Sequence, residues 1–194
     1  MITHQPHIPT LEEVKGNPMQ ASAPYAEALV QHAERQPVQI MVPGHSGKPQ
    51  DMAIRLANLF GERAVQLDLP LMLNGIDMGE GSPLMQAQQL AAEAWGARRT
   101  WFMTNGASQA NRTAAVAARG LGERVLVQRS SHSSFSDGIL LTGLIPRFVQ
   151  PSIDERHGIA HGVTPGQVAA ILQKAVEEER PVASVDIVSP IYYG

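Results

Sequence analysis

Residues 100–149 read TWFMTNGASQANRTAAVAARGLGERVLVQRSSHSSFSDGILLTGLIPRFV, and in them short apolar runs alternate with longer segments. Strands are expected at Thr100–Met103, Arg124–Arg129 and Ile145–Val149, and helices at about Gln109–Arg119 and over residues 130–143. Strands that alternate with helices of this length are typical of a parallel sheet covered by helices. The stretch therefore predicts an α/β fold.

The C-terminal part continues the same alternation. Thr164 and Gln167 have the spacing of a capping box and predict the start of a helix, and Val182–Val188 predicts one more strand. The whole is expected to be a three-layer fold with a mainly parallel sheet of about four strands. No helix is expected between the last strand and Gly194, although parallel sheets are covered on both faces. The sheet is therefore expected to be incomplete, as in a fragment or one half of a split enzyme.

The N-terminal part is predicted to be helical and less regular. The expected elements are an extended arm over residues 1–20, a helix at about Ser22–Arg35 with Ser22 as N-cap, a helix at about Gln50–Phe60 that ends at Gly61, and a helix from Ser82-Pro83 to Gly96. The chain is expected to consist of an arm and helix, residues 1–40, and a larger domain, residues 41–194.

The composition excludes several classes of protein. The net charge is -3 and no basic stripe is visible, which argues against a nucleic-acid partner. The chain has no cysteine, so disulfides and thiolate zinc sites are excluded. No apolar run approaches the roughly 20 residues that cross a bilayer, and the N-terminus lacks the pattern of a signal peptide. A soluble, cytoplasmic protein without membrane partners is expected.

The segment Thr104–Ser108, TNGAS, has the strongest local signal for a ligand. It joins an expected strand to an expected helix, and the first N–H groups of a helix bind anions well. Ser108 adds a hydroxyl donor. The alternative is that Asn105 or Ser108 only caps the helix.

His132 follows the next expected strand, so it should lie at the same edge of the sheet as Ser108. An imidazole at this edge could stack on a planar cofactor or transfer a proton. The alternative is a histidine at a helix start that bonds to the backbone.

Other polar motifs predict less. PGHSGKP, residues 43–49, fails as a Walker loop and is expected to be a turn that brings His45 or Lys48 near a pocket or interface. His157 and His161 are four residues apart, but the glycine and loop context argue against a metal site. The role of Asp186, which lies within an apolar strand, stays open.

Five segments together resemble the major domain of the ornithine/lysine/arginine decarboxylases, which are enzymes of the pyridoxal-phosphate (PLP) fold type I. The segments are MVPGHSGKP, GSPLMQAQQLAAEAWGARRTWFMTNGASQAN, RVLVQRSSHSSFSDGILLTGLIPRFVQP, HGIAHGVTPGQV and SPIYYG. They occur in the order and with the spacing of the family, over roughly residues 40–194.

The resemblance implies a role for particular residues. Gly106, Ala107 and Ser108 match the segment that holds the PLP phosphate, and His132 matches the histidine that stacks on the pyridine ring. Ser189, in SPIYYG, matches a strand-end position near the active site. The resemblance also implies an amino-acid substrate and a homodimer or larger homo-oligomer.

The chain departs from the family in ways that affect function. The family usually has threonine at Ala107, lysine at Ser133 and threonine at Ile191. The lysine that holds the cofactor and the aspartate that pairs with its ring nitrogen follow SPIYYG in the family. None of Lys15, Lys48 and Lys174 has the setting of that lysine. The chain alone is therefore expected to be inactive, with the remainder of the enzyme as its partner.

Three functions remain open at this point. The first is a portion of a PLP-dependent decarboxylase that acts on a basic amino acid. The second is another fold-type-I activity, such as an aminotransferase or a carbon–sulfur lyase. The third is a non-catalytic partner subunit that kept the fold and lost the chemistry.

Overall fold

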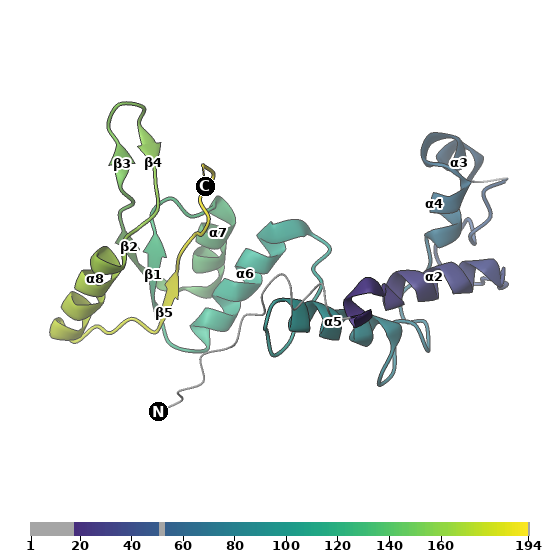
Figure 1. Cartoon of the computed structure of the whole chain (residues 1–194), viewed down its shortest axis with the longest axis horizontal. Helices are drawn as coiled ribbons and strands as arrows, with labels where there is room; N and C mark the ends of the chain where they lie inside the picture. The colour runs from purple at the N-terminus through teal and green to yellow at the C-terminus, as the bar shows by residue number, and fades with distance from the viewer. Residues whose placement is uncertain (1–17, 51–52, 194) are drawn as a thin grey trace. The chain divides into compact units, whose positions relative to one another are not determined.

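The computed structural model describes residues 18–50 and 53–193, and the chain divides into two compact units, Met1–Phe102 and Met103–Gly194 (Figure 1). The domain boundary expected near residue 40 stays a prediction. Most of the expected extended arm lies outside the described residues. Its end, however, belongs to a short 3-10 helix, η1 (Pro18–Ala21), and is not extended.

The first unit is helical. Its α-helices are α2 (Pro24–Glu34), α3 (Ile54–Phe60), α4 (Glu62–Leu67) and α5 (Pro83–Ala94). Helix α2 packs against α5, and Gln20 Nε2 donates to the Leu90 carbonyl at 3.0 Å. Helices α3 and α4 meet at Gly61, whose φ of 90° ends the first helix and begins the second. The helix α4 was not predicted.

The two predicted N-caps of this unit have different outcomes. Ser82 is confirmed as the N-cap of α5, because its hydroxyl accepts from the Met85 N–H at 3.4 Å. Ser22 is wrong as the N-cap of α2, since that position is taken by Ala23, one residue later. Proline favours the first position of a helix, so Pro24 sets the start of α2.

The second unit contains a parallel three-stranded sheet. Its strands are β1 (Arg124–Gln128), β2 (Ile145–Val149) and β5 (Ser184–Asp186), in the order β2-β1-β5. In the central strand, Val127 lies between Phe148 of β2 and Asp186 of β5. The predicted α/β class with mainly parallel strands is confirmed.

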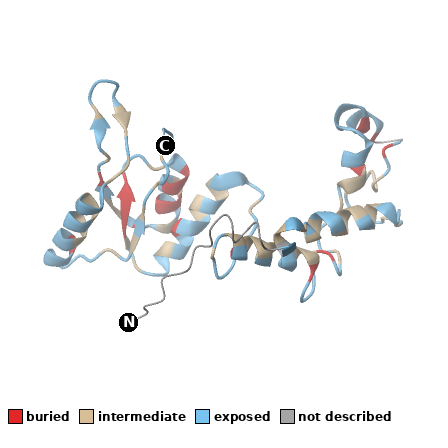
Figure 2. Cartoon of the chain, viewed as in Figure 1, coloured by how far each residue is buried: buried red, intermediate tan, exposed pale blue. Residues whose placement is uncertain are grey.

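Helices cover both faces of this sheet (Figure 1). Helices α6 (Gly106–Arg119) and α7 (Ser133–Thr142) lie on one side, and α8 (Pro165–Glu177) lies on the other. The main core joins one face of β1 to α6 and α7, and consists of Ala115, Val125, Val127, Phe135, Ile139 and Leu144. Figure 2 shows buried residues gathered on β1 and on α7. The three-layer arrangement follows from strands that are apolar on both faces.

Several expected boundaries of the second unit are confirmed and one strand is wrong. The strands β1 and β2 and the capping box of α8 are where the sequence predicts them. Residues 100–103 form no strand, and the sheet of the described residues has three strands where about four were expected. No described strand pairs with them, and an unpaired segment cannot satisfy its backbone as a strand does. A small antiparallel hairpin, β3 (Ile153–Asp154) with β4 (Ile159–Ala160), was not predicted.

Candidate functional site

A cavity of about 370 Å³ opens at the carboxyl ends of β1 and β5. This is the edge where open α/β sheets collect ligands. The lining comes from the turn after β1, the chain from the end of β5 onward, and one residue each from α6 and α7: Asn111, Ser130, Ser131, His132, Phe135, Asp186, Ile187, Val188, Ser189, Pro190, Ile191 and Tyr192. His132 and Ser189, which the sequence singled out separately, thus line the same cavity.

His132 is exposed and caps the N-terminus of α7. Its Nδ1 accepts from the Ser134 backbone N–H at 3.2 Å and lies 2.8 Å from the Ser134 hydroxyl. Because a backbone N–H can only donate, this Nδ1 carries no proton, and the proton of the neutral ring is on Nε2. The backbone bond that the sequence gave as the alternative is present, and it leaves Nε2 available to a ligand.

The orientation of the His132 ring depends on α6. Asn111 Nδ2 donates to the Ser134 hydroxyl at 2.9 Å, and that hydroxyl is then able to donate to Nδ1 of His132. Ser134, in the middle of this short chain of hydrogen bonds, is 1% exposed. Sequence reasoning missed both partners. The pairing of residues 23 positions apart needs the packing of α6 on α7, which no local pattern encodes.

Gly106, Ala107 and Ser108 form the first turn of α6. The Asn105 side chain does not cap the helix, and no acceptor for these three N–H groups is found among the described residues. Gly106 has a φ of 69°, and a Cβ placed on it would meet no atom within 4 Å. The first turn of α6 therefore presents N–H groups with no described acceptor, and there is open space at the Cβ position of Gly106.

The turn at Gly106–Ser108 does not line the cavity, but its helix does through Asn111. Ser108 and Asn111 are three residues apart on α6, so their side chains lie on neighbouring parts of one helix face. The strand that was expected to lead into this turn is absent, and α6 begins three residues before the expected start.

Asp186 has a definite environment, which the sequence left open. Its Oδ2 accepts from the Ser131 hydroxyl at 2.8 Å. Burial raises the pKa of the Asp186 carboxyl above its ordinary value, and the hydrogen bond from Ser131 partly opposes this. No ion pair to Asp186 is found among residues 18–50 and 53–193.

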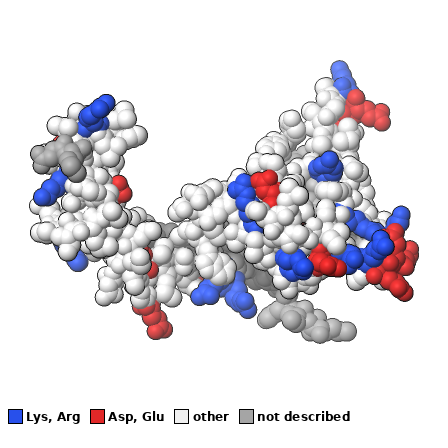
Figure 3. All heavy atoms as spheres, turned by 180° about the vertical axis from the view of Figure 1, so that it is seen from behind, with Lys and Arg blue, Asp and Glu red and all other residues white. Residues whose placement is uncertain are grey.

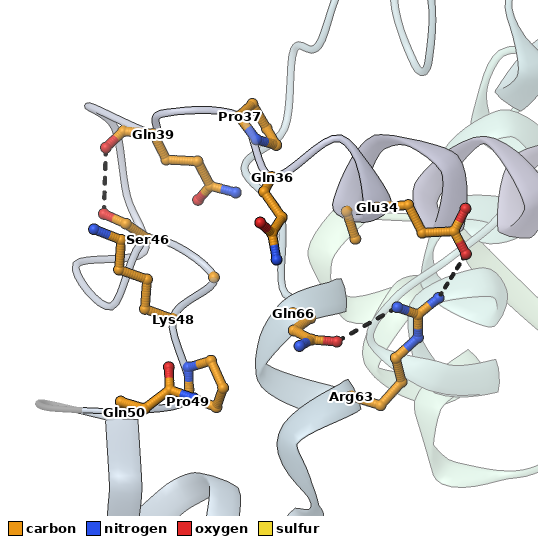
Figure 4. A pocket seen from close by; sticks show the side chains of 12 residues that line it. Glu34, Gln36, Pro37, Gln39, Ser46, Lys48, Pro49, Gln50, Arg63 and Gln66 are labelled. Atoms are coloured by element: carbon orange, nitrogen blue, oxygen red, sulfur yellow. Dashed lines mark hydrogen bonds and ion pairs between the residues drawn. The ribbon is translucent and has the colours of Figure 1, made fainter.

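A second cavity, of about 600 Å³, lies in the first unit beside the PGHSGKP turn (Figure 4). Lys48 lines it, whereas His45 is not among the lining residues and lies 3.1 Å, from Nε2 to Oδ2, from Asp68. The cavity is mainly polar: Gln36, Gln39, Gln50 and Gln66 contribute amides, and Arg63 bonds to Gln66 and pairs with Glu34 at its rim. It is separate from the cavity that holds His132.

One charged pair lies on the β3–β4 hairpin. His157 Nδ1 lies 2.8 Å from Asp154 Oδ2 on the β3–β4 hairpin, and this hydrogen bond holds the pKa of Asp154 below its ordinary value. The described residues contain no group of three or more side chains suited to a metal ion. On the face drawn in Figure 3, acidic and basic side chains occur next to each other. No described helix has both the length and the apolar character to span a bilayer.

The chain is similar to known bacterial decarboxylases. The arginine decarboxylase of Bacillus subtilis (strain 168) is 34% identical over 177 residues, which are 90% of this chain and 35% of that protein. The lysine decarboxylase LdcA of Pseudomonas aeruginosa is 31% identical over 138 residues, 68% of this chain and 18% of that protein. The chain therefore spans about a third or less of the length of these relatives.

A solved structure and a family model agree with these relatives. The structure of lysine decarboxylase A from Pseudomonas aeruginosa superposes with a TM-score of 0.65 at 27% identity, over 80% of this chain and 22% of that one. The model of the Orn/Lys/Arg decarboxylase major domain matches residues 23–194. The parallel sheet, its covering helices and the match over most of the sequence lead to one conclusion: the chain belongs to the family of the Orn/Lys/Arg decarboxylase major domain.

Proposed function

We propose that the chain is a portion of a PLP-dependent decarboxylase that acts on a basic amino acid. The observation that carries the proposal is the meeting of His132 and Ser189 at one cavity, at the ligand-binding edge of a sheet whose family is that of the Orn/Lys/Arg decarboxylases. The proposal includes a homo-oligomer in the cytoplasm, and its small-molecule substrate is the basic amino acid.

The described residues fit a cofactor with a phosphate and a flat ring. The cavity volume of about 370 Å³ is within the range of small-molecule sites. The first turn of α6 offers uncapped N–H donors, which suit a dianion. The exposed imidazole of His132 is fixed through Nδ1, and a fixed flat ring is suited to stacking.

Each residue has a defined role in this proposal. Gly106, Ala107 and Ser108 bind the phosphate with N–H groups and the Ser108 hydroxyl, and His132 stacks on the ring. Ser189 belongs to the segment after β5 that lines the cavity, and it contributes a hydroxyl to the same site. When bound, PLP supplies the electron sink that accepts the electrons released as CO2 leaves.

The lysine of the reaction has to come from outside the described residues of the second unit. Lys174 lies on α8, 3.9 Å from Glu178, and is not part of the cavity. Lys48 belongs to the first unit, and Lys15 lies outside the described residues. We therefore propose that the remainder of the enzyme provides the lysine and the acidic partner of the ring.

The test is a titration of the intact protein with PLP, followed by borohydride reduction and mass spectrometry. The expected result is a cofactor absorption band and one modified lysine outside residues 1–194. A protein that folds but shows no band and releases no CO2 from arginine, lysine or ornithine would support the non-catalytic partner subunit. Transamination or carbon–sulfur cleavage would support another fold-type-I activity.

Substitutions test the individual roles. Ser108→Ala should weaken PLP binding about tenfold, because one donor to a charged phosphate is lost. His132→Ala should alter the absorption band and weaken binding several-fold, because ring stacking is lost. Ser136→Ala, at an exposed position of α7, is the matched control and should behave as the wild type. Unchanged PLP affinity in Ser108→Ala would remove that residue from the site.

A further inference from the structure

Two polar residues stand at the ends of the neighbouring strands β1 and β5. Gln128 closes β1 and Asp186 closes β5. Gln128 is 1% exposed, and Asp186 is half-buried. Both positions are costly for polar side chains unless hydrogen bonds compensate for the lost water. Such local conflicts are expected mainly where function requires them.

The amide of Gln128 connects the two chain segments that form the cavity walls. Its Nε2 donates to the Ser130 hydroxyl at 2.9 Å, and its Oε1 accepts from the Val188 backbone N–H at 3.2 Å. The orientation of the amide is unambiguous, because the Val188 N–H can only donate. One buried side chain thus holds the turn after β1 to the segment after β5.

Asp186 makes a second connection between the same segments. Its carboxyl accepts from the Ser131 hydroxyl at 2.8 Å, while the Ser131 N–H donates to the Gln128 carbonyl at 3.0 Å. Ser131 is followed along the chain by His132, and Val188 is followed by Ser189. The two connections therefore fix where these two site residues stand.

We propose that Gln128 and Asp186 are positioning residues of the candidate site. Their hydrogen bonds to Ser130, Ser131 and Val188 form a polar clamp that sets the separation of His132 and Ser189. The identity of the ligand, PLP, rests on the proposed function. The geometry of the clamp rests only on the hydrogen bonds described above. The clamp acts through the two walls, and neither side chain needs to touch the cofactor.

Variants of Asp186 and Ser131 separate positioning from direct contact with the ligand. In the intact enzyme, Asp186→Ala and Ser131→Ala should each weaken PLP binding about fivefold, and the double variant should be no weaker than either single one. Asp186→Asn keeps an acceptor for Ser131 and should bind PLP as the wild type does. If Asp186→Asn is as weak as Asp186→Ala, the charge itself contacts the ligand and the positioning role is overturned.

Variants of Gln128 test the clamp without the cofactor. Gln128→Leu should speed amide hydrogen exchange at Val188 by about tenfold, because the N–H loses its buried acceptor. Ser130→Ala is the milder variant, in case Gln128→Leu does not fold, and should give a smaller increase at Val188. Glu155→Gln, on the exposed hairpin, is the control and should change nothing. If amide exchange at Val188 is unchanged in both Gln128→Leu and Ser130→Ala, the proposed clamp is wrong.

The two proposals fail in different ways. If the wild-type protein does not bind PLP, the proposed function is wrong, yet the exchange at Val188 and the nitrogen NMR shifts of the His132 ring still test the clamp. The expected NMR result is a proton on Nε2 in the wild type, with a changed His132 environment in Asp186→Ala and a retained one in Asp186→Asn. If PLP binds normally while all clamp variants match the wild type, only the clamp is wrong.

Discussion

The two units of the chain bury their apolar residues to very different extents. In the second unit, Val125 and Leu126 of β1 are fully buried between layers of helices. In the first unit, Val38 and Ile40 are each more than 90% exposed, and the buried cluster found among its described residues consists of Ala53, Ala57 and Val65. The unit that packs its own strands is also the unit that carries the candidate site. A site needs walls that do not move, and a buried parallel sheet provides them.

The largest expected effect is on the free energy of unfolding, and it is tested by a leucine-to-alanine substitution in each of the two units. Leu126→Ala should cost about 2–5 kcal/mol of unfolding free energy, because it opens a cavity in the core. Leu71→Ala, at a side chain that is 73% exposed in the first unit, should change it by less than about 0.5 kcal/mol. Urea unfolding of the two variants measures the difference. Equal costs would mean that Leu71 is covered in the intact protein, and the comparison would fail.

A smaller effect is expected where α6 and α7 approach each other. A Cβ on Gly138 would lie 2.5 Å from the Ala115 Cβ, closer than atoms can pack, so Gly138→Ala should cost about 1–3 kcal/mol. Gly166→Ala on α8 meets no atom within 4 Å and should be neutral or slightly stabilising. Thermal unfolding of both variants tests whether tight packing is confined to the side of the sheet that supports His132.

The smallest effects concern pH and have opposite signs at two aspartates. The pKa of Asp186 is raised in the folded state. As the pH rises from the ordinary pKa of Asp, roughly 4, to this raised pKa, the Asp186 carboxyl therefore lowers the free energy of unfolding. Asp186→Asn should therefore gain in Tm, relative to the wild type, as the pH rises through this range.

Asp154 behaves in the opposite way. Its pKa is lowered by the bond to His157, so the stability it contributes is present above roughly pH 4 and is lost as the pH falls through the lowered value. The loss of stability in Asp154→Asn, relative to the wild type, should therefore disappear at acidic pH. Parallel pH profiles for the two Asn variants would contradict the assigned environments.

Most of the local structure was predictable because its signals are local. The capping box at Thr164, the cap at Ser82 and the apolar runs of β1 and β2 each depend on a few consecutive residues. The strand expected at residues 100–103 was wrong because a strand is stable only beside a partner strand. Its apolar composition is not enough.

The candidate site was only half predictable for the same reason. His132 could be found from its place after β1 and before α7. The turn at Gly106–Ser108 could be found as the start of a helix, although the strand expected before it is absent. The hydrogen bonds from Asn111 to Ser134 and from Val188 to Gln128 join residues 23 and 60 positions apart. No spacing rule covers such distances.

The sequence by itself determined the α/β class, the family resemblance and the absence of a lysine in the expected setting, because these depend on the kinds and the order of residues. Only the tertiary structure decided that His132 and Ser189 line one cavity, and that Gln128 and Asp186 tie its walls together. The physical reason is that a hydrogen bond depends on distance and direction in space. Both are fixed only when β1 and β5 lie side by side.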